Sequence, residues 1–268
     1  MSEKPPPGLA LAPAWAARLR ALTPARVGLG RTGVSLETRD LLDFQRCHAL
    51  ARDAVHSQLQ AASLAATLSA IAATEALPLH SAASDRATYL QRPDLGRTLS
   101  EASRTLLAER AVPSPPINES ARPSRLAFVV ADGLSALAVE RHAEPLLKEL
   151  IPLVDGWQLV PLCVVEQARV AIGDEIGVAL GADVSIVLIG ERPGLSSPDS
   201  LGAYITWQPR PGKTDAERNC ISNIRDGGLT YSQATAQLVY YLTEARRRQL
   251  TGIALKEATQ ALKEGERQ

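Results

Sequence analysis

The sequence predicts an α/β protein in which an N-terminal helical region, residues 1–122, precedes a doubly wound, Rossmann-like domain with a mainly parallel sheet, residues 123–268. One observation is that the apolar pattern changes near residue 125, from helical spacing interrupted by prolines to short, unbroken apolar runs. A second is that these runs alternate with helical segments. Strands that read as continuous apolar runs are typical of a parallel sheet buried on both faces.

Helices joined by proline- and glycine-marked breaks are expected in residues 1–122. Their apolar residues recur at steps of three and four, which is the period of a helix with one buried face. A Thr-x-x-Glu pattern is a capping box, in which side chains satisfy the first free backbone amides of a helix. We expect a short helix over 13–22 and a long helix that begins at Thr38, with apolar positions at Leu41, Phe44, Ala51, Val55 and Leu59. After a break at 92–97, a helix capped at Thr98 is expected to run through Leu107. A proline-rich linker follows at 112–118.

Strands and helices alternate in the second region. The expected strands are 126–131, 157–165, 183–189 and 202–207. The expected helices begin at Leu134, cover about 169–180, open at the capping box Thr214-x-x-Glu217, and run from an N-cap at Ser232 to the arginines 246–248. Cations at that last position suit the negative end of a helix dipole.

Composition and charge exclude several classes of function. The 268 residues include 29 basic and 29 acidic side chains, so the chain lacks the positive field that nucleic-acid binding uses. Its apolar runs are strand-sized, far below the ~18 residues of a membrane span. Three cysteines without C-x-x-C spacing fit reduced thiols better than disulfides or a zinc site. We therefore expect a cytoplasmic protein with neither a nucleic-acid nor a membrane partner.

Short motifs that could carry chemistry favour structural interpretations. G-x-G-x-x-G at 28–33 follows no strand, so we interpret it as a turn rather than a nucleotide loop. Gly-Lys-Thr at 212–214 lacks the earlier glycine of a P-loop and suits a capped helix start. Ser135 with His142 as base would resemble a nucleophile elbow, but Leu137 stands where the elbow needs glycine, which favours Ser135 as an N-cap. No histidine pair has metal-ligand spacing, so neither catalytic nor metal-binding residues are predicted.

Polar residues that follow the expected strands are the candidates for a binding site, because ligands of wound sheets lie beyond the carboxyl ends of the strands. These segments are 132–135, 166–174 and 190–195. The last of them carries an acid and a guanidinium, Glu191 and Arg192. With residues 220–225, placed on the next capped helix, it predicts a polar cluster at one edge of the sheet. The residues alone therefore indicate an α/β ligand-binding or assembly protein without legible catalytic machinery.

Seven blocks resemble the family of small (light) subunits of ethanolamine ammonia-lyase, and together they span nearly the whole chain. They are TPARVGLGRTG at 23–33, DFQRCHALARDAV at 43–55, YLQRPDLGR at 89–97, VADGLS at 130–135, RVAIGDEIG at 169–177, LIGERPGL at 188–195 and RNCISNIR at 218–225. The number, length and order of these blocks set the resemblance apart from chance.

This resemblance implies a carbon–nitrogen lyase that uses adenosylcobalamin to convert ethanolamine to acetaldehyde and ammonia by a radical mechanism. It implies a hetero-oligomer in which a TIM-barrel large subunit binds ethanolamine and this chain covers the open end of the barrel. The cobalamin would lie between the two subunits, with the family's cofactor contacts matching Val170, Glu191 and Cys220. The absence of a D-x-H-x-x-G stretch implies base-on cobalamin, in which cobalt keeps its own nucleotide base. Residues 1–122 would contact the large subunit and support oligomer assembly.

Two alternatives stay open. The chain could stabilise the large subunit as an assembly subunit without touching the cofactor, or it could be a free-standing hydrolase that uses Ser135 and His142. The cellular location is also open, because small subunits of the family can carry a longer N-terminal extension linked to a bacterial microcompartment. The segment before the first block is short here, so we expect the cytoplasm, with a microcompartment as the alternative.

Overall fold

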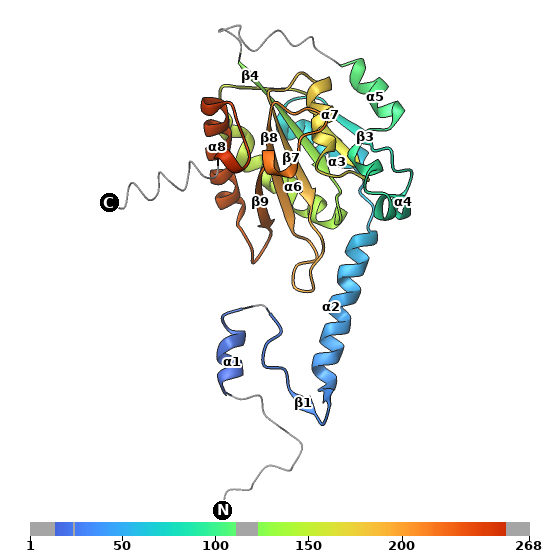
Figure 1. The fold of residues 1–268 in the computed structure, drawn as a ribbon, viewed down its shortest axis with the longest axis vertical. Helices are drawn as coiled ribbons and strands as arrows, with labels where there is room; N and C mark the ends of the chain where they lie inside the picture. Colours follow the sequence, from blue (N-terminus) through green and yellow to red (C-terminus); the bar gives the residue numbers. More distant parts are fainter. Residues whose placement is uncertain (1–13, 24, 111–122, 256–268) are drawn as a thin grey trace, which may run out of the picture.

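The computed structural model describes residues 14–23, 25–110 and 123–255, and it is built on one large sheet flanked by helices (Figure 1). The helices are α1 (Ala14–Arg20), α2 (Thr38–His56), α3 (Ala61–Ala72), α4 (Arg86–Gln91), α5 (Glu101–Ala108), α6 (Ala136–Leu150), α7 (Ile172–Ala179) and α8 (Tyr231–Arg248). The strands are β1 (Arg31–Thr32), β2 (Ser35–Leu36), β3 (Ala76–His80), β4 (Ser124–Ala131), β5 (Trp157–Leu159), β6 (Leu162–Glu166), β7 (Val184–Gly190), β8 (Leu201–Trp207) and β9 (Asn219–Ile224). The 3₁₀ turns are η1 (Leu95–Arg97), η2 (Ile151–Leu153) and η3 (Asp215–Glu217).

The large sheet is mainly parallel, in the order β3-β6-β4-β7-β8-β9, with β5 paired to the start of β4. Strands β3, β6, β4 and β7 pair in parallel. Strands β8 and β9 continue the sheet in antiparallel pairing. The predicted α/β class with a mainly parallel sheet is therefore confirmed.

Apolar side chains of the sheet pack on both of its faces. One buried cluster joins the sheet to α3, α6 and α8, and it includes Phe128, Leu146 and Leu238. A second cluster joins the other face to α5 and α7, through residues such as Leu107 and Ile176. Burial on both faces explains why the central strands read as unbroken apolar runs. Among the described residues, no helix combines the length and apolarity that crossing a membrane requires.

Two expectations for the strands need correction. The apolar run 157–165 forms two strands, because Pro161 separates β5 from β6 and proline has no amide hydrogen for the ladder. Residues 220–225 were placed on a helix, and this was wrong, since Asn219–Ile224 is strand β9. The capping box at Thr214 opens only the turn η3, after which Arg218 is extended, with φ −115° and ψ 144°.

Helix starts differ from the expected caps by two residues. Ser100, not Thr98, caps α5 through a hydrogen bond from the Ser103 amide. Thr230, not Ser232, caps α8 and forms a capping box with Gln233. The N-cap expected at Ser135 is confirmed, because its hydroxyl accepts from the amide of Ala138.

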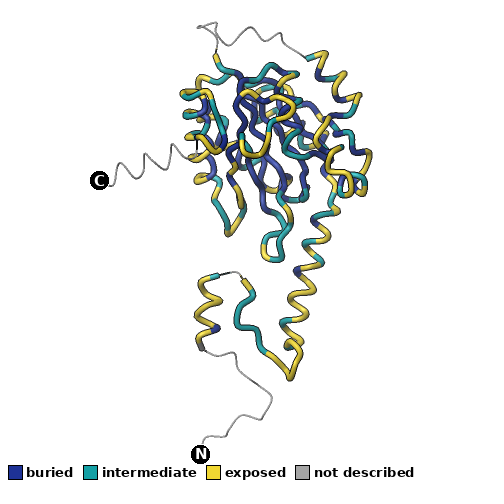
Figure 2. Tube along the Cα trace, viewed as in Figure 1, coloured by how far each residue is buried: buried dark blue, intermediate teal, exposed yellow. Residues whose placement is uncertain are grey.

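The N-terminal arm, residues 14–56 without Pro24, lies apart from the sheet. Helix α2 projects from the body, and α1 and the β1–β2 hairpin lie near its far end (Figures 1 and 2). The expected long helix is present, but its apolar residues Leu41 and Phe44 are exposed rather than packed in the core. The G-x-G-x-x-G segment ends in the hairpin, where Gly33 has a φ of +64°, so the turn interpretation is confirmed. The predicted linker 112–118 lies outside the described residues.

Candidate functional site

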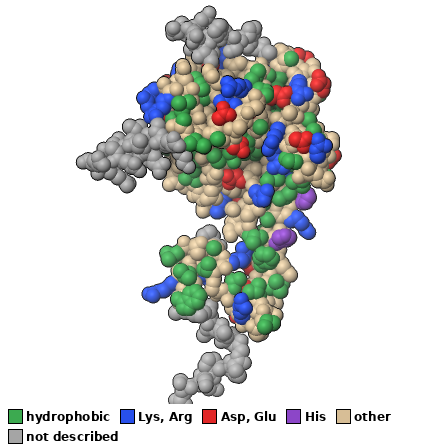
Figure 3. All heavy atoms as spheres, viewed as in Figure 1, with side chains coloured by type: hydrophobic (Ala, Val, Ile, Leu, Met, Phe, Trp, Pro, Cys, Tyr) green, Lys and Arg blue, Asp and Glu red, His purple; other side chains and the backbone are tan. Residues whose placement is uncertain are grey.

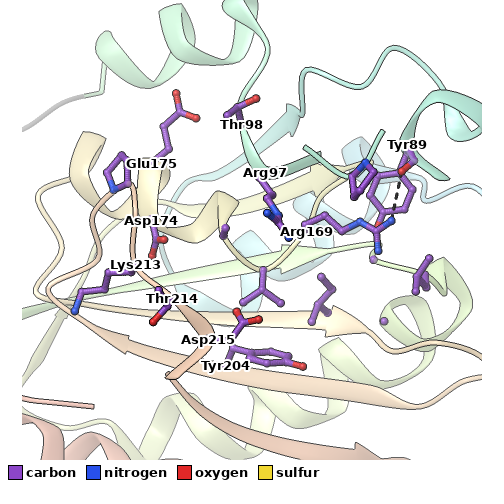
Figure 4. Close-up of a pocket in the computed structure, with 18 of the residues that line it drawn as sticks. Tyr89, Arg97, Thr98, Arg169, Asp174, Glu175, Tyr204, Lys213, Thr214 and Asp215 are labelled. Carbon is purple, nitrogen blue, oxygen red and sulfur yellow. Dashed lines mark hydrogen bonds between the residues drawn. The ribbon is translucent and has the colours of Figure 1, made fainter. Parts of the chain in front are cut away.

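A cavity of about 1080 Å³ lies at the carboxyl edge of the central strands, on the α5–α7 face of the sheet (Figure 4). The chain passes from β4 to β6 on one side of β4 and then crosses to β7 on the other side. The crevice between β4 and β7 is therefore the point at which the winding direction changes, and wound sheets bind ligands at such points. The wall includes residues from segments far apart in sequence, namely Tyr89, Arg97, Thr98, Arg104, Leu134, Arg169, Val170, Asp174, Glu175, Glu191, Arg192, Tyr204, Lys213, Thr214 and Asp215.

Close backbone contact between the loops after β4 and β7 forms the inner end of the cavity. The Leu134 amide donates to the carbonyl of Gly190 at 2.9 Å. A Cβ added to Gly190 would lie 2.0 Å from the Ser135 carbonyl oxygen and 2.6 Å from that of Asp132. Only glycine fits this approach, which brings the two loops together under the cavity.

Asp132, directly after β4, fastens the loop that carries Val170. Its carboxylate accepts hydrogen bonds from the amides of Gln167 at 2.9 Å and Ala168 at 3.0 Å. Gln167 has a φ of +55°, a conformation that is costly for a residue other than glycine and that these bonds help to hold. The Arg86 guanidinium lies 3.4 Å from the same carboxylate. Complete burial outweighs these favourable contacts and raises the pKa of Asp132 to about 6.

Glu191 leaves β7 at the cavity wall with its carboxylate fixed by two donors. Oε2 accepts from the Ser200 hydroxyl at 2.5 Å and from the Asn223 amide at 3.1 Å. Within the described residues Oε1 has no hydrogen-bond partner. One oxygen of this carboxylate is therefore held by the protein, while the other can accept a hydrogen bond from a ligand.

Cys220 lies on β9 directly opposite Tyr204 of β8. Paired residues of adjacent strands point to the same face of a sheet, and Tyr204 lines the cavity. The Cys220 thiol is exposed and lies 3.2 Å from the Ser222 hydroxyl. Burial raises the pKa of the Tyr204 phenol, and its contact with Cys220 adds to this rise, so Tyr204 is a neutral hydrogen-bonding group beside the thiol.

The three residues expected at a cofactor therefore gather at one edge of the sheet. Val170 and Glu191 line the cavity, and Cys220 lies on the strand beside it. Arg169 lies in the expected segment 166–174, whereas sequence reasoning did not place Tyr89 and Arg97 in the site, where both line the wall near Arg169 (Figure 4). Tyr89 precedes the 92–97 break and Arg97 ends it; the residues alone indicated only a turn there, although the block 89–97 is one of those that carry the family resemblance.

A buried ion pair supports the far side of the cavity. The Arg218 guanidinium donates to both oxygens of Asp174, at 2.8 and 2.6 Å, and also to the Thr206 hydroxyl at 2.8 Å. It further donates to the Lys213 carbonyl at 3.1 Å, which ties the loop 211–215 to α7. The Gly-Lys-Thr segment therefore lines the cavity from a fixed loop, and its Thr214 forms the expected capping box.

Ser135 and His142 do not form a nucleophile–base pair. The Ser135 hydroxyl is fully buried and donates to the Pro198 carbonyl at 2.9 Å while it caps α6. His142 Nδ1 lies 2.8 Å from the Tyr231 hydroxyl. No cluster of His, Cys, Asp and Glu that could hold a metal ion occurs in the described part of the chain.

Comparison with known proteins identifies relatives over almost the entire chain. Residues 13–256 match the model of a family described as ethanolamine ammonia-lyase light chain (EutC). The chain is 57% identical over 241 residues to the ethanolamine ammonia-lyase small subunit of Pseudomonas paraeruginosa, covering 89% of this chain and 86% of that protein. It is 55% identical over 248 residues to the small subunit of the same name from Ralstonia nicotianae, covering 92% and 89%.

Proposed function

This chain belongs to the family of small (light) subunits of ethanolamine ammonia-lyase, and we propose that it forms one wall of a base-on adenosylcobalamin site at the interface with the large subunit. The family's lyase activity, on ethanolamine, belongs to the complex with that large subunit. One observation carries the proposal. A single cavity at the carboxyl edge of the sheet collects the Val170 and Glu191 segments, with Cys220 on the strand beside it.

The chemistry of the cavity wall fits a corrin. A corrin has an apolar ring face and a rim of amide side chains, which both donate and accept hydrogen bonds. Val170 and Leu134 offer apolar surface, and Glu191 Oε1 and the Tyr204 hydroxyl offer polar groups that can bind amides. When bound, adenosylcobalamin supplies the radical chemistry of the reaction, and the protein binds the cofactor, orients it and encloses it.

The positions of the histidines support base-on binding. His48, His56, His80 and His142 all lie among the described residues, and none of them lines the cavity. His80 Nδ1 lies 2.8 Å from the Ser81 carbonyl, and His142 is engaged by Tyr231. This chain therefore offers no imidazole to replace the nucleotide base on cobalt.

We also propose that the N-terminal arm contacts the large subunit. Its large apolar side chains are exposed in the isolated chain, and an exposed apolar surface of this extent marks an interaction site. The Rossmann-like interpretation of the second region belongs to the same proposal. It is supported by the helices on both faces and by the cavity at the point where the winding changes direction.

Glu191→Gln in the assembled enzyme tests the cofactor wall. The variant keeps the shape of the side chain but removes its charge, so amide donors of the corrin lose a charged acceptor. We expect cobalamin affinity, measured by absorbance titration, to fall about tenfold. Cys220→Ala should weaken binding in the same direction through lost packing beside Tyr204.

Glu140→Gln, an exposed glutamate on α6, is the matched control and should bind cobalamin as the wild type does. Size-exclusion chromatography with the large subunit distinguishes the cofactor wall from the alternative of an assembly subunit. If Glu191→Gln and Cys220→Ala weaken subunit association but leave the cofactor affinity of the remaining complex unchanged, the chain is an assembly subunit without direct cofactor contact.

A further inference from the structure

Two arginine side chains from joined segments line the same part of the cavity wall. Arg97 comes from the turn η1 and Arg169 from the loop between β6 and α7, and Figure 4 shows Arg97 beside Arg169, whose guanidinium extends to the ring of Tyr89. The two segments are joined, because the Arg169 amide donates to the Gly96 carbonyl at 2.7 Å. A Cβ on Gly96 would lie 3.0 Å from Arg169 Cγ, so glycine at this position leaves room for the arginine stem.

Among the described residues, no acidic side chain balances the charge of Arg97 and Arg169. The acidic residues of the cavity wall are engaged elsewhere, with Asp174 and Asp215 on Arg218, Glu175 on Arg104, and Glu191 on Ser200 and Asn223. Neither Arg97 nor Arg169 forms an ion pair within the described residues. Arg169 Nε is buried and has no hydrogen-bond partner there. A buried donor without a partner beside a second guanidinium indicates a missing anionic acceptor.

The Arg169 guanidinium is held in a fixed orientation. It stacks on the ring of Tyr89, with Cζ 4.1 Å from the ring centroid, and its Nη2 donates to the Tyr89 carbonyl at 3.4 Å. The ring is fixed in turn, since the Tyr89 hydroxyl donates to the Ala168 carbonyl at 3.1 Å. Arg86 lies against the same ring, at 4.7 Å from its centroid. A planar donor group oriented in this way suits the recognition of a phosphate.

We infer that Arg97 and Arg169 form a phosphate-binding subsite that holds the phosphodiester of the cofactor's nucleotide tail. This inference rests on the proposed function. The peripheral side chains of the corrin are uncharged amides, whereas the phosphodiester carries a negative charge. It is the part of the cofactor that complements two unpaired guanidinium groups. The subsite would anchor the nucleotide tail at the Tyr89 side of the cavity.

Ligands that differ only in the tail test the subsite. The assembled enzyme is titrated with adenosylcobalamin, with adenosylcobinamide phosphate, which keeps the phosphate but lacks the base, and with adenosylcobinamide, which lacks both. Arg97→Gln and Arg169→Gln should each weaken binding of the two phosphate-containing ligands about ten- to hundredfold. Their affinity for adenosylcobinamide should equal that of the wild type, because the contact in question is absent from that ligand.

Arg192→Gln is the matched control, since Arg192 also lines the cavity without an ion pair among the described residues. Any change that it causes should be the same for all three ligands. Arg169→Lys, which keeps the charge without the planar fork, should retain part of the phosphate preference. Each variant is first checked for thermal unfolding and for association with the large subunit.

The subsite is overturned if the arginine variants weaken binding of all three ligands equally or leave all three unchanged. A failure of the proposed function gives a different pattern, in which Glu191→Gln also changes no affinity. A failure of the subsite alone leaves the effect of Glu191→Gln intact while the arginine variants do not distinguish the ligands.

Discussion

Asp132 shows at the scale of one residue how the strand end positions the site. Three donors, the amides of Gln167 and Ala168 and the Arg86 guanidinium, lie at this carboxyl group, which holds Gln167 in its left-handed conformation before Val170. Burial raises the pKa of Asp132 from 3.8 to about 6, despite the neighbouring Arg86. The folded chain therefore binds the proton more tightly than the unfolded chain does. Its contribution to stability is greatest below pH 4 and is lost as the pH rises from about 4 to about 6.

Asp132→Asn removes this titration while keeping the size of the side chain. The free energy of unfolding of the wild type, minus that of the variant, should fall between pH 4 and pH 6 by on the order of 3 kcal/mol and stay level above that range. Arg86 and Tyr89, the titratable groups beside Asp132, keep their charge state across these pH values. Urea unfolding at half-unit pH steps measures the difference, and Asp226→Asn, on an exposed aspartate, is the control. If the unfolding free energy of the wild type minus that of the variant rises with pH in this range, the burial-raised pKa of Asp132 is contradicted.

At the scale of elements, the sequence predicts the central strands, whose two faces are both buried, and misses the strands at the two edges of the sheet. The runs that became β4 and β7 are apolar throughout because both of their faces are covered. Strand β3 was missed because Pro78 interrupts it, which an edge strand tolerates since one side of it needs no ladder bonds. Strand β9, at the other edge, mixes polar residues with buried ones and follows a helix-like capping box.

The same reasoning explains which part of the site could be predicted. Glu191 and the loop before Val170 follow buried strands, and the rule that ligands bind at carboxyl ends locates both. Arg97 and Tyr89 come from the connection between β3 and β4, which packs on the sheet from outside. No local pattern indicates that such a connection reaches the cavity, because its position depends on tertiary contacts such as that of Arg169 with Gly96.

Ser135→Ala tests whether Ser135, in the turn between β4 and α6, serves as the N-cap of α6 rather than as a nucleophile. The change removes the N-cap of α6 and the bond to the Pro198 carbonyl, so the protein should lose about 1–2 kcal/mol of unfolding free energy. Thr230→Ala, at the exposed N-cap of α8, is the comparison and should cost less, because it leaves no buried carbonyl without a donor. Wild-type ester hydrolysis that disappears in Ser135→Ala, with stability unchanged, would instead favour the hydrolase alternative.

At the scale of the whole molecule, the body buries most of its large apolar side chains, whereas the N-terminal arm exposes most of its own. The sheet buries its apolar residues on both faces, whereas apolar side chains gather on the surface of the arm (Figure 3). The large exposed apolar residues of the arm are Trp15, Leu19, Leu22, Val34, Leu36, Leu41, Leu42, Phe44 and Leu50. The end of the arm is joined to α4 of the body by the hydrogen bond from Arg86 Nε to the Val55 carbonyl at 2.7 Å. The arm therefore has the composition of an interface without the partner surface that would cover it.

Leu42→Ser tests whether the large subunit covers the arm. Leu42 is 58% exposed on α2, so the change should leave the unfolding of the isolated chain nearly unaltered. If Leu42 packs against the large subunit, association measured by size-exclusion chromatography or calorimetry should weaken about tenfold, the cost of a lost buried side chain. Leu153→Ser, at 57% exposure on η2 of the body, provides the matched control and should leave association unchanged. Equal weakening by both variants would argue against the arm as the specific contact. A change confined to self-association of the isolated chain would show that a second copy, rather than the large subunit, covers this surface.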